Sequence, residues 1–114
     1  MCHFAFYMYS GTPDVNNFKA KIFSALADPV RLRILEYLRS GEKCVCEIVP
    51  YIGISQPSIS RHLAILKSCG LVKQRKDGNR RLYSITLPAV FDAIDAITPN
   101  LLEALSRYVF EQTF

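Results

Sequence analysis

Two cysteines one residue apart have the clearest capacity for chemistry in this sequence. Cys44 and Cys46 lie in "EKCVCEIV", a stretch that is typical of the start of a short helix. Thiolates select soft ions, and two sulfurs that share one ion lie within roughly 4 Å of each other. Residues i and i+2 of a regular helix point about 200° apart. Binding of one ion by both cysteines is therefore expected to unwind or tilt the first turn, which would make the helix a two-state switch.

Capping and breaking residues predict the helices that surround the pair. Four segments are predicted to be helical: Asp14 to about Leu26, Asp28 to Gly41, Glu42 to Gly53, and Ser55 to Gly70. Aspartate and serine are good N-caps, and glycine commonly follows the last helical residue. Pro50 is expected to cut the third helix, because proline lacks the N–H group that a helix interior needs. The third and fourth helices, joined by "YIGIS", have the spacing of a helix-turn-helix.

A different pattern follows the fourth helix. In "LVKQRKDGNRRLYSI" two β-prone runs flank "DG", a strong signal for a β-hairpin. The tail from Pro88 is helical again, and Pro99 is expected to kink or restart it. The predicted fold is mainly α with a β-hairpin wing: a winged helix-turn-helix, dimeric through apolar terminal helices. Residues 1–13 are predicted to form an N-terminal arm, and residues 14–114 the DNA-binding and dimerisation domain.

Charge and composition limit the possible partners. The chain has 114 residues, half of them hydrophobic and 21% charged, which is typical of one globular domain. Its net charge is +4, but residues 55–83 carry +6 and the remainder −2. Such a basic half favours a nucleic-acid binder, although a solvated basic face would give the same count. No apolar run reaches the roughly 20 residues of a membrane helix, and no basic leader begins the sequence, so we expect a cytoplasmic protein with reduced thiols and no membrane partner.

Three blocks of the sequence resemble a known family. "FSALADPVRLRILEYL", "KCVCEI" and "SQPSISRHLAILKSCGLVKQRKDGNRRLYSI" are similar, in order and spacing over about residues 18–87, to the ArsR/SmtB family of metal- and metalloid-responsive repressors. "CVCEI" resembles the "CVCDL" element of its arsenic-sensing and cadmium/lead-sensing branches. The resemblance implies a homodimer that binds double-stranded operator DNA, represses a resistance gene and leaves the DNA when an ion binds. It implies no enzymatic activity and no required cofactor, with As(III) at Cys44 and Cys46 as the leading inducer.

The third ligand of the ion distinguishes the branches. Where the arsenic branch often has a third cysteine, this sequence has Val49. Cys2 and His3 on the arm are the candidates to complete the site, as in the cadmium/lead branch, which would make Cd²⁺, Pb²⁺ or Zn²⁺ the inducer. A thiol redox sensor is a further alternative. Cys69 is expected to be a packing residue or a bystander.

The predicted DNA contacts lie on the fourth helix and around the hairpin turn. They are Gln56, Ser58, Ser60, Arg61 and His62 on the helix, and Lys76, Asn79 and Arg80 on the wing. Short polar and basic side chains of a recognition helix read base edges, glutamine pairing with adenine and arginine with guanine, while a wing reaches an adjacent groove. His62 could instead be a solvated or core-edge histidine, and Arg75 and Arg81 could be strand-face charges.

Other classes of protein fit this sequence less well. An enzyme or redox protein would need a feature such as CxxC, a Gly-rich phosphate loop, a His-Glu metal motif or the spacing of a nucleophile triad, and the sequence contains none. An architectural DNA-binding protein with silent cysteines remains an alternative. Its affinity for DNA would not respond to any ion, whereas that of a sensor would.

Overall fold

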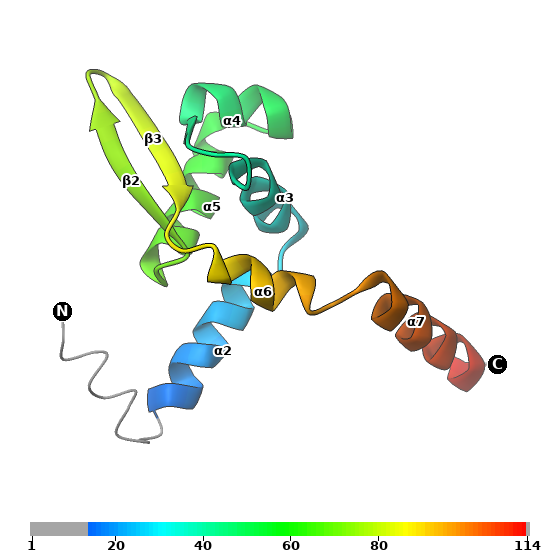
Figure 1. Ribbon diagram of the computed structural model, residues 1–114. Helices are drawn as coiled ribbons and strands as arrows, with labels where there is room; N and C mark the ends of the chain where they lie inside the picture. The colour runs from blue at the N-terminus through cyan, green and yellow to red at the C-terminus, as the bar shows by residue number, and fades with distance from the viewer. Residues whose placement is uncertain (1–13, 114) are drawn as a thin grey trace.

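Polar capping residues set the helix ends in the computed structural model, which describes residues 14–113. The helices are α2 (Asp14–Leu26), α3 (Pro29–Leu38), α4 (Val45–Ile52), α5 (Gln56–Ser68), α6 (Ala89–Asp95) and α7 (Pro99–Thr113), arranged as in Figure 1. The Asp28 carboxylate accepts hydrogen bonds from the N–H groups of Val30 and Arg31, at 2.8 and 3.2 Å, and so caps α3. Ser55 caps α5 in the same way. These two predicted caps are confirmed, whereas Asp14, predicted to cap the first helix, is a residue of α2 itself.

Helix α4 departs from the prediction at two points. It begins at Val45, after Cys44, and it runs through Pro50 to Ile52 instead of breaking there. The helix has only eight residues, so the proline removes one hydrogen bond near its end and interrupts no long ladder. Gly53 then closes the helix with φ at +86°, in the left-handed region that favours glycine.

A three-stranded antiparallel sheet lies beside the helix-turn-helix. Its strands are β1 (Lys43–Cys44), β2 (Val72–Asp77) and β3 (Arg80–Ile85), in the order β1-β3-β2. Gly78 and Asn79 connect β2 and β3, and only Gly78 has a positive φ, +63°, as in a type II′ turn. The predicted hairpin wing is confirmed. Strand β1 was not predicted, because its two residues carry no periodic signal and its place comes from pairing with β3, Cys44 opposite Leu82.

The core holds α5 in place between α3, α4 and the wing. The largest side chains that are fully buried are Ile34, Leu35, Leu38, Ile48, Ile59, Leu63 and Leu66. The predicted inward stripe of α5 is confirmed, because Ile59, Leu63 and Leu66 lie in this core. Cys69 is buried in the same cluster, which confirms the expectation that it packs. The polar face of α5 is consequently left at the surface.

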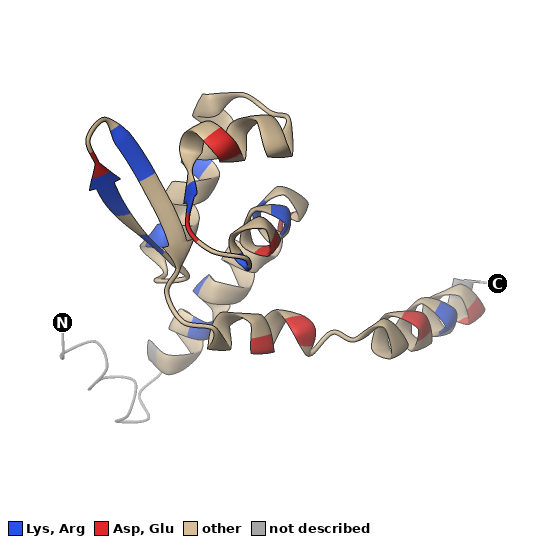
Figure 2. Cartoon of the chain, turned by 45° about the horizontal axis from the view of Figure 1, so that its top comes forward, with Lys and Arg blue, Asp and Glu red and all other residues tan. Residues whose placement is uncertain are grey.

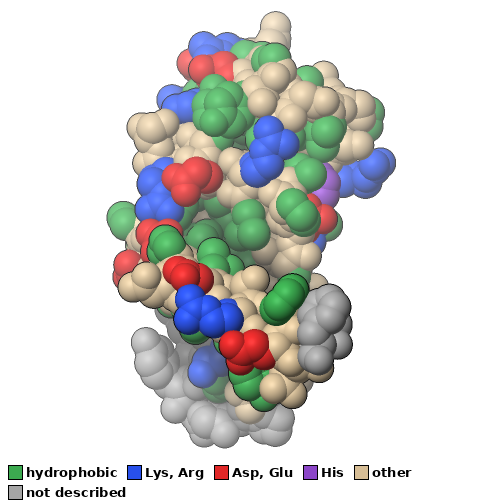
Figure 3. Space-filling model, turned by 90° about the vertical axis from the view of Figure 1, so that its right-hand side faces the viewer, with side chains coloured by type: hydrophobic (Ala, Val, Ile, Leu, Met, Phe, Trp, Pro, Cys, Tyr) green, Lys and Arg blue, Asp and Glu red, His purple; other side chains and the backbone are tan. Residues whose placement is uncertain are grey.

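The C-terminal helices differ in how they meet the core. Pro99 restarts the chain as α7 after α6, as predicted. Arg39 joins α6 to α3 through a salt bridge to Asp95 at 2.9 Å and lies 4.0 Å from the centre of the Phe91 ring. Residues 99–112 of α7 are all exposed, and Figure 3 shows hydrophobic side chains in the open on the face that includes this helix. No described helix has the length and apolar character that crossing a membrane requires.

Candidate functional site

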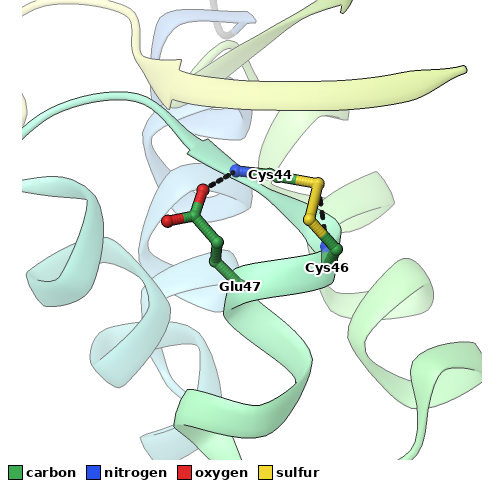
Figure 4. Close-up of a disulfide and its surroundings, with 3 residues drawn as sticks. All are labelled: Cys44, Cys46 and Glu47. Carbon is green, nitrogen blue, oxygen red and sulfur yellow. Dashed lines mark hydrogen bonds between the residues drawn. A yellow bond between two sulfur atoms is a disulfide. The ribbon is translucent and has the colours of Figure 1, made fainter.

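The cysteine pair lies where β1 ends and α4 begins (Figure 4). Cys44 is the N-cap of α4 with extended backbone, φ −73° and ψ 148°, and Cys46 is in the first turn. Their Cα atoms are 5.0 Å apart and their sulfurs are joined in a disulfide. Two expectations are therefore wrong for this pair: the side chains do not diverge as in a regular helix, because Cys44 is outside the helix, and the two sulfurs are bonded instead of being reduced thiols, whereas Cys69 is a free thiol as expected. The sulfurs lie together without any unwinding of α4.

Hydrogen bonds at the start of α4 hold the pair in this arrangement. The Cys46 N–H donates to Cys44 Sγ at 3.0 Å, and the Cys44 N–H donates to Glu47 Oε1 at 3.0 Å. The positive end of a helix dipole favours a sulfur that carries negative charge. Cys44 is 3% exposed whereas Cys46 is exposed, so a solvent-borne reagent reaches Cys46 first.

A cavity of about 390 Å³ opens beside the two sulfurs. Three parts of the chain line it: Cys44, Val45 and Cys46; Gln56 and Ser60 at the start of α5; and Asn79, Arg80, Arg81 and Tyr83 on the wing. Four residues predicted to contact DNA, Gln56, Ser60, Asn79 and Arg80, thus share one cavity with the cysteine pair. This juxtaposition joins the two functional motifs of the sequence.

The cavity is basic. Arg80 and Arg81 are exposed on β3, and Figure 2 shows basic residues along both strands of the wing and acidic residues on α6 and α7. Arg75 is engaged elsewhere, because it forms a salt bridge with Glu42 at 2.8 Å and holds the pKa of that carboxyl below its ordinary value. Burial raises the pKa of Tyr83, an effect that the charge of Arg81 opposes in part.

The remaining predicted contacts of α5 and the wing lie outside this cavity. The Ser58 hydroxyl contacts Ser55 Oγ at 3.1 Å, and the exposed Arg61 donates to Ser58 Oγ at 3.3 Å. Lys76 is exposed on β2, opposite Arg81 of β3. These side chains are open to a ligand of the helix or wing, and their contact with DNA stays a prediction.

His62 has a partner inside the protein. Its Nδ1 lies 3.1 Å from Nη1 of Arg31 on α3, and the side chain is half-buried. The same guanidinium donates to the carbonyls of Ala25 at 2.6 Å and Ser24 at 3.3 Å, at the end of α2. Arg31 thus links α2 and α3 to the recognition helix, which agrees with the core-edge alternative for His62; contact between His62 and DNA stays a prediction.

Within the described part of the chain, the ligating side chain beside the cysteine pair is Glu47, whose carboxylate accepts the hydrogen bond of the Cys44 N–H group. Across residues 14–113 no three or more histidine, cysteine, aspartate or glutamate side chains gather so that they could hold an ion. Cys2 and His3, the predicted third ligands, lie outside the described residues. The described residues therefore supply a two-sulfur site, and the assignment of Cys2 and His3 stays a prediction.

Three residues were not predicted as site residues. Arg81 and Tyr83 line the cavity, and Arg31 contacts His62. Arg31 contacts His62 from 31 positions away in the chain, and nothing in the sequence signals that pairing. Arg81 and Tyr83 reach the cavity because β3 runs past β1. A weak signal existed only for Arg81, as one of several basic residues in the hairpin.

Known proteins share both the sequence and the fold. The model of the family described as "Bacterial regulatory protein, arsR family" matches residues 28–74. The chain is 45% identical over 75 residues to a probable mercury resistance operon repressor of Streptomyces lividans, covering 66% of this chain but only 60% of that protein. It is 38% identical over 80 residues to an arsenical resistance operon repressor of Staphylococcus xylosus, covering 70% of this chain and 73% of the relative.

A solved structure gives the same likeness in three dimensions. The NMR structure of a homodimeric winged helix-turn-helix DNA-binding domain from Mycobacterium bovis, described as a possible ArsR-family transcriptional regulator, matches with a TM-score of 0.73. The identity is 33%, and the match covers 82% of this chain and 94% of that one. The winged helix-turn-helix architecture predicted from the sequence is confirmed.

Proposed function

Because this chain belongs to the arsR family of bacterial regulatory proteins, which are DNA-binding transcription regulators and not enzymes, we propose that it represses transcription from an operator and is released by a metal or metalloid ion. Cys44 and Cys46 are the proposed ion ligands, and As(III) is the leading inducer. One observation carries the proposal: Cys44 and Cys46 line the same cavity as the start of the recognition helix and the wing.

The DNA-binding part of the proposal is supported by the surface of α5 and the wing. The hydrophobic side of α5 is buried, so Gln56, Ser60 and Arg61 are left exposed. Such polar and basic side chains at the start of a recognition helix suit base edges and phosphates. Arg80 and Arg81 add positive charge beside them, which attracts the DNA backbone.

A homodimer is the proposed DNA-binding form. Helix α7 exposes Leu101, Leu102, Leu105 and Tyr108, each by 39% or more. An exposed helix of 15 residues is only marginally stable by itself, and covering this apolar stripe with a second copy would stabilise it. The Mycobacterium bovis relative is described as homodimeric. A two-fold dimer presents two recognition helices to two half-sites of an operator.

The cysteine pair suits several soft ions. Two thiolates suit As(III), Cd²⁺, Pb²⁺ and Zn²⁺ alike. The Staphylococcus relative is named for arsenical resistance and the Streptomyces relative for mercury resistance, so Hg²⁺ joins the ions to be tested. A ligand from the N-terminal arm, Cys2 or His3, would favour the larger cations over As(III).

The disulfide between Cys44 and Cys46 supports a second candidate, a thiol redox sensor. In that case a peroxide takes two electrons and two protons from the paired thiols and leaves as water, while the sulfurs bond to each other. The regulator would then respond to oxidant instead of an ion. Both candidates act through the same two residues and differ in the signal.

Fluorescence anisotropy of the reduced protein on its own promoter fragment tests the proposal. The complex is titrated with arsenite and, in parallel, with Cd²⁺, Zn²⁺, Hg²⁺ and hydrogen peroxide. The double variant Cys44→Ser/Cys46→Ser should keep operator binding and lose the response. Cys69→Ser is the matched control, because that buried cysteine lies outside the site, and it should respond like the wild type.

Each outcome supports one of the candidate signals or contradicts the sensing function. Release by arsenite alone supports an As(III) sensor, and stronger release by Cd²⁺ favours a site completed from the arm. Release by peroxide alone supports the redox sensor. If the wild type binds its promoter but responds to nothing, the proposed sensing function is wrong.

A further inference from the structure

The cavity beside the cysteine pair is built as an anion site. Arg80 and Arg81 supply two positive charges, Gln56 and Ser60 supply polar groups, and none of the described residues that line it carries a carboxylate. Within residues 14–113 no salt bridge engages either arginine, in contrast to Arg75 with Glu42. Its walls are the recognition helix and the wing, the two elements that approach a DNA backbone most closely in this fold.

Coupling between the ion and DNA needs a physical cause other than unwinding of α4. Cys44 is the extended N-cap of α4 and lies outside the helix, so after reduction of the disulfide both thiolates can turn to one ion while α4 stays intact. The cavity offers a simpler cause. An ion held by Cys44 and Cys46 would keep further ligands, such as hydroxide, water or another thiolate, and these would compete for space beside the residues that line the basic cavity.

We propose that a phosphate of the DNA backbone enters the cavity between Cys46, the start of α5 and Arg80 and Arg81, and that an ion bound to the cysteine pair and DNA exclude each other there. This inference rests on the proposed function and adds its mechanism: inducer and operator compete for one basic cavity. A negative charge on the cysteine pair, or a ligand bound to it, weakens DNA binding directly. DNA in turn shields the pair from solvent.

Charge substitution at position 46 tests the phosphate contact without any ion. Cys46→Asp places a fixed negative charge in the cavity, and Cys46→Asn is its neutral match in size. Aspartate in the first turn of a helix suits the helix dipole, so both variants should stay folded, as circular dichroism will check. At low salt the Asp variant should bind duplex DNA about tenfold more weakly than the Asn variant, and the ratio should shrink in high salt because ions screen the repulsion.

A matched pair on α6 provides the control. Ala93 is an exposed residue of α6, and this helix lies away from α4 and the wing tip in Figure 1. With the low-salt condition set at about 0.1 M, where the Debye length is about 10 Å, Ala93→Asp and Ala93→Asn should therefore bind DNA equally within about twofold, because exposed charges farther apart than that are screened. Equal binding by the two position-46 variants at low salt would overturn the proposal.

Thiol protection is the second measurement. The reduced wild type is alkylated with iodoacetamide, with and without saturating operator, and the modified peptides are quantified by mass spectrometry. Operator should slow modification of Cys46 at least about tenfold, as occlusion by a bound backbone requires, and should leave a reference thiol in Ala93→Cys unaffected. Undiminished alkylation of Cys46 on bound DNA would overturn the inference.

These results separate the inference from the proposed function. Phosphate contacts are independent of sequence, so the charge comparison is made on operator and non-operator duplexes alike. A protein that no ion or oxidant releases, but whose Asp variant binds weakly, would overturn the sensing function and the exclusion between ion and DNA, and it would support the phosphate contact in the cavity. A wild type that binds no duplex at all would overturn both.

Discussion

Replacing Arg31 by alanine should loosen the recognition helix from outside its DNA-contact surface. The guanidinium of Arg31 donates to the carbonyl of Ala25 at 2.6 Å and contacts His62 Nδ1 at 3.1 Å, and both contacts are partly buried. A third contact, to the carbonyl of Ser24, is exposed. Alanine removes all three and leaves the Ala25 carbonyl and the His62 ring without this donor.

The expected loss of stability follows from these contacts. A hydrogen bond that involves a charged group contributes about 1.5–3 kcal/mol, and partial exposure lowers that figure because water replaces the lost partner. Two partly buried bonds at the low end give about 2–3 kcal/mol for Arg31→Ala, with little added by the exposed bond to Ser24. Arg31→Lys should recover less than half of the lost stability. A lysine ammonium lacks the planar fork of donors with which the guanidinium reaches Ala25 and His62 at the same time.

Urea unfolding followed by far-ultraviolet circular dichroism measures the effect, at one protomer concentration because dimerisation shifts apparent stability. Arg33→Ala is the matched control: it removes an exposed arginine from the same helix and should change stability by no more than about 0.5 kcal/mol. Arg31→Ala should also bind operator more weakly than Arg33→Ala, although both lose one charge. If the two variants are equally stable and bind alike, the proposed link from α2 to the recognition helix is wrong.

Three further predictions test the DNA surface, the core and an ion pair. Arg61→Ala should weaken operator binding by about 1–3 kcal/mol, and unchanged anisotropy at physiological salt would remove Arg61 from the contact surface. Leu63→Ala should lower the free energy of unfolding, measured in urea, by about 2–5 kcal/mol, because Leu63 is fully buried. A smaller change would mean that neighbouring side chains move into the cavity that the substitution leaves. The hydrogen bond from Arg39 holds the pKa of Asp95 below its ordinary 3.8, so the pair stabilises the protein above that pH and is lost as the pH falls through 3.8 and below. The melting temperature of the wild type should exceed that of Asp95→Asn at pH 7, and the gap should narrow as the pH falls through 3.8 and below; a gap independent of pH would contradict this.

Much of the secondary structure was predictable because its signals are local. Asp28 and Ser55 cap helices through hydrogen bonds to N–H groups two or three residues away, and Gly53 and Gly78 supply backbone conformations that a turn needs on the spot. The inward stripe of α5 repeats with the helix period, so it could be read without knowing what it packs against. The ranges of the recognition helix and the wing in the sequence were predictable from local signals as well.

The cysteine pair was predicted as a site, but its geometry was predicted wrongly. Whether Cys44 is inside the helix depends on β1, and β1 exists only because it pairs with β3, almost 40 residues further along the chain. That pairing turns Cys44 out of α4 and brings its sulfur to Cys46. Local propensity favoured a longer helix, and the tertiary contact overrode it.

The sequence by itself determined which residues carry the chemistry: two thiols, a polar and basic recognition helix, and a basic hairpin. Only the tertiary structure decided that Cys46, Gln56 and Arg80 share one cavity and that Arg31 contacts His62. Capping and periodicity act within a few residues, whereas these contacts join segments that meet only when the core of α3, α4 and α5 has packed against the wing.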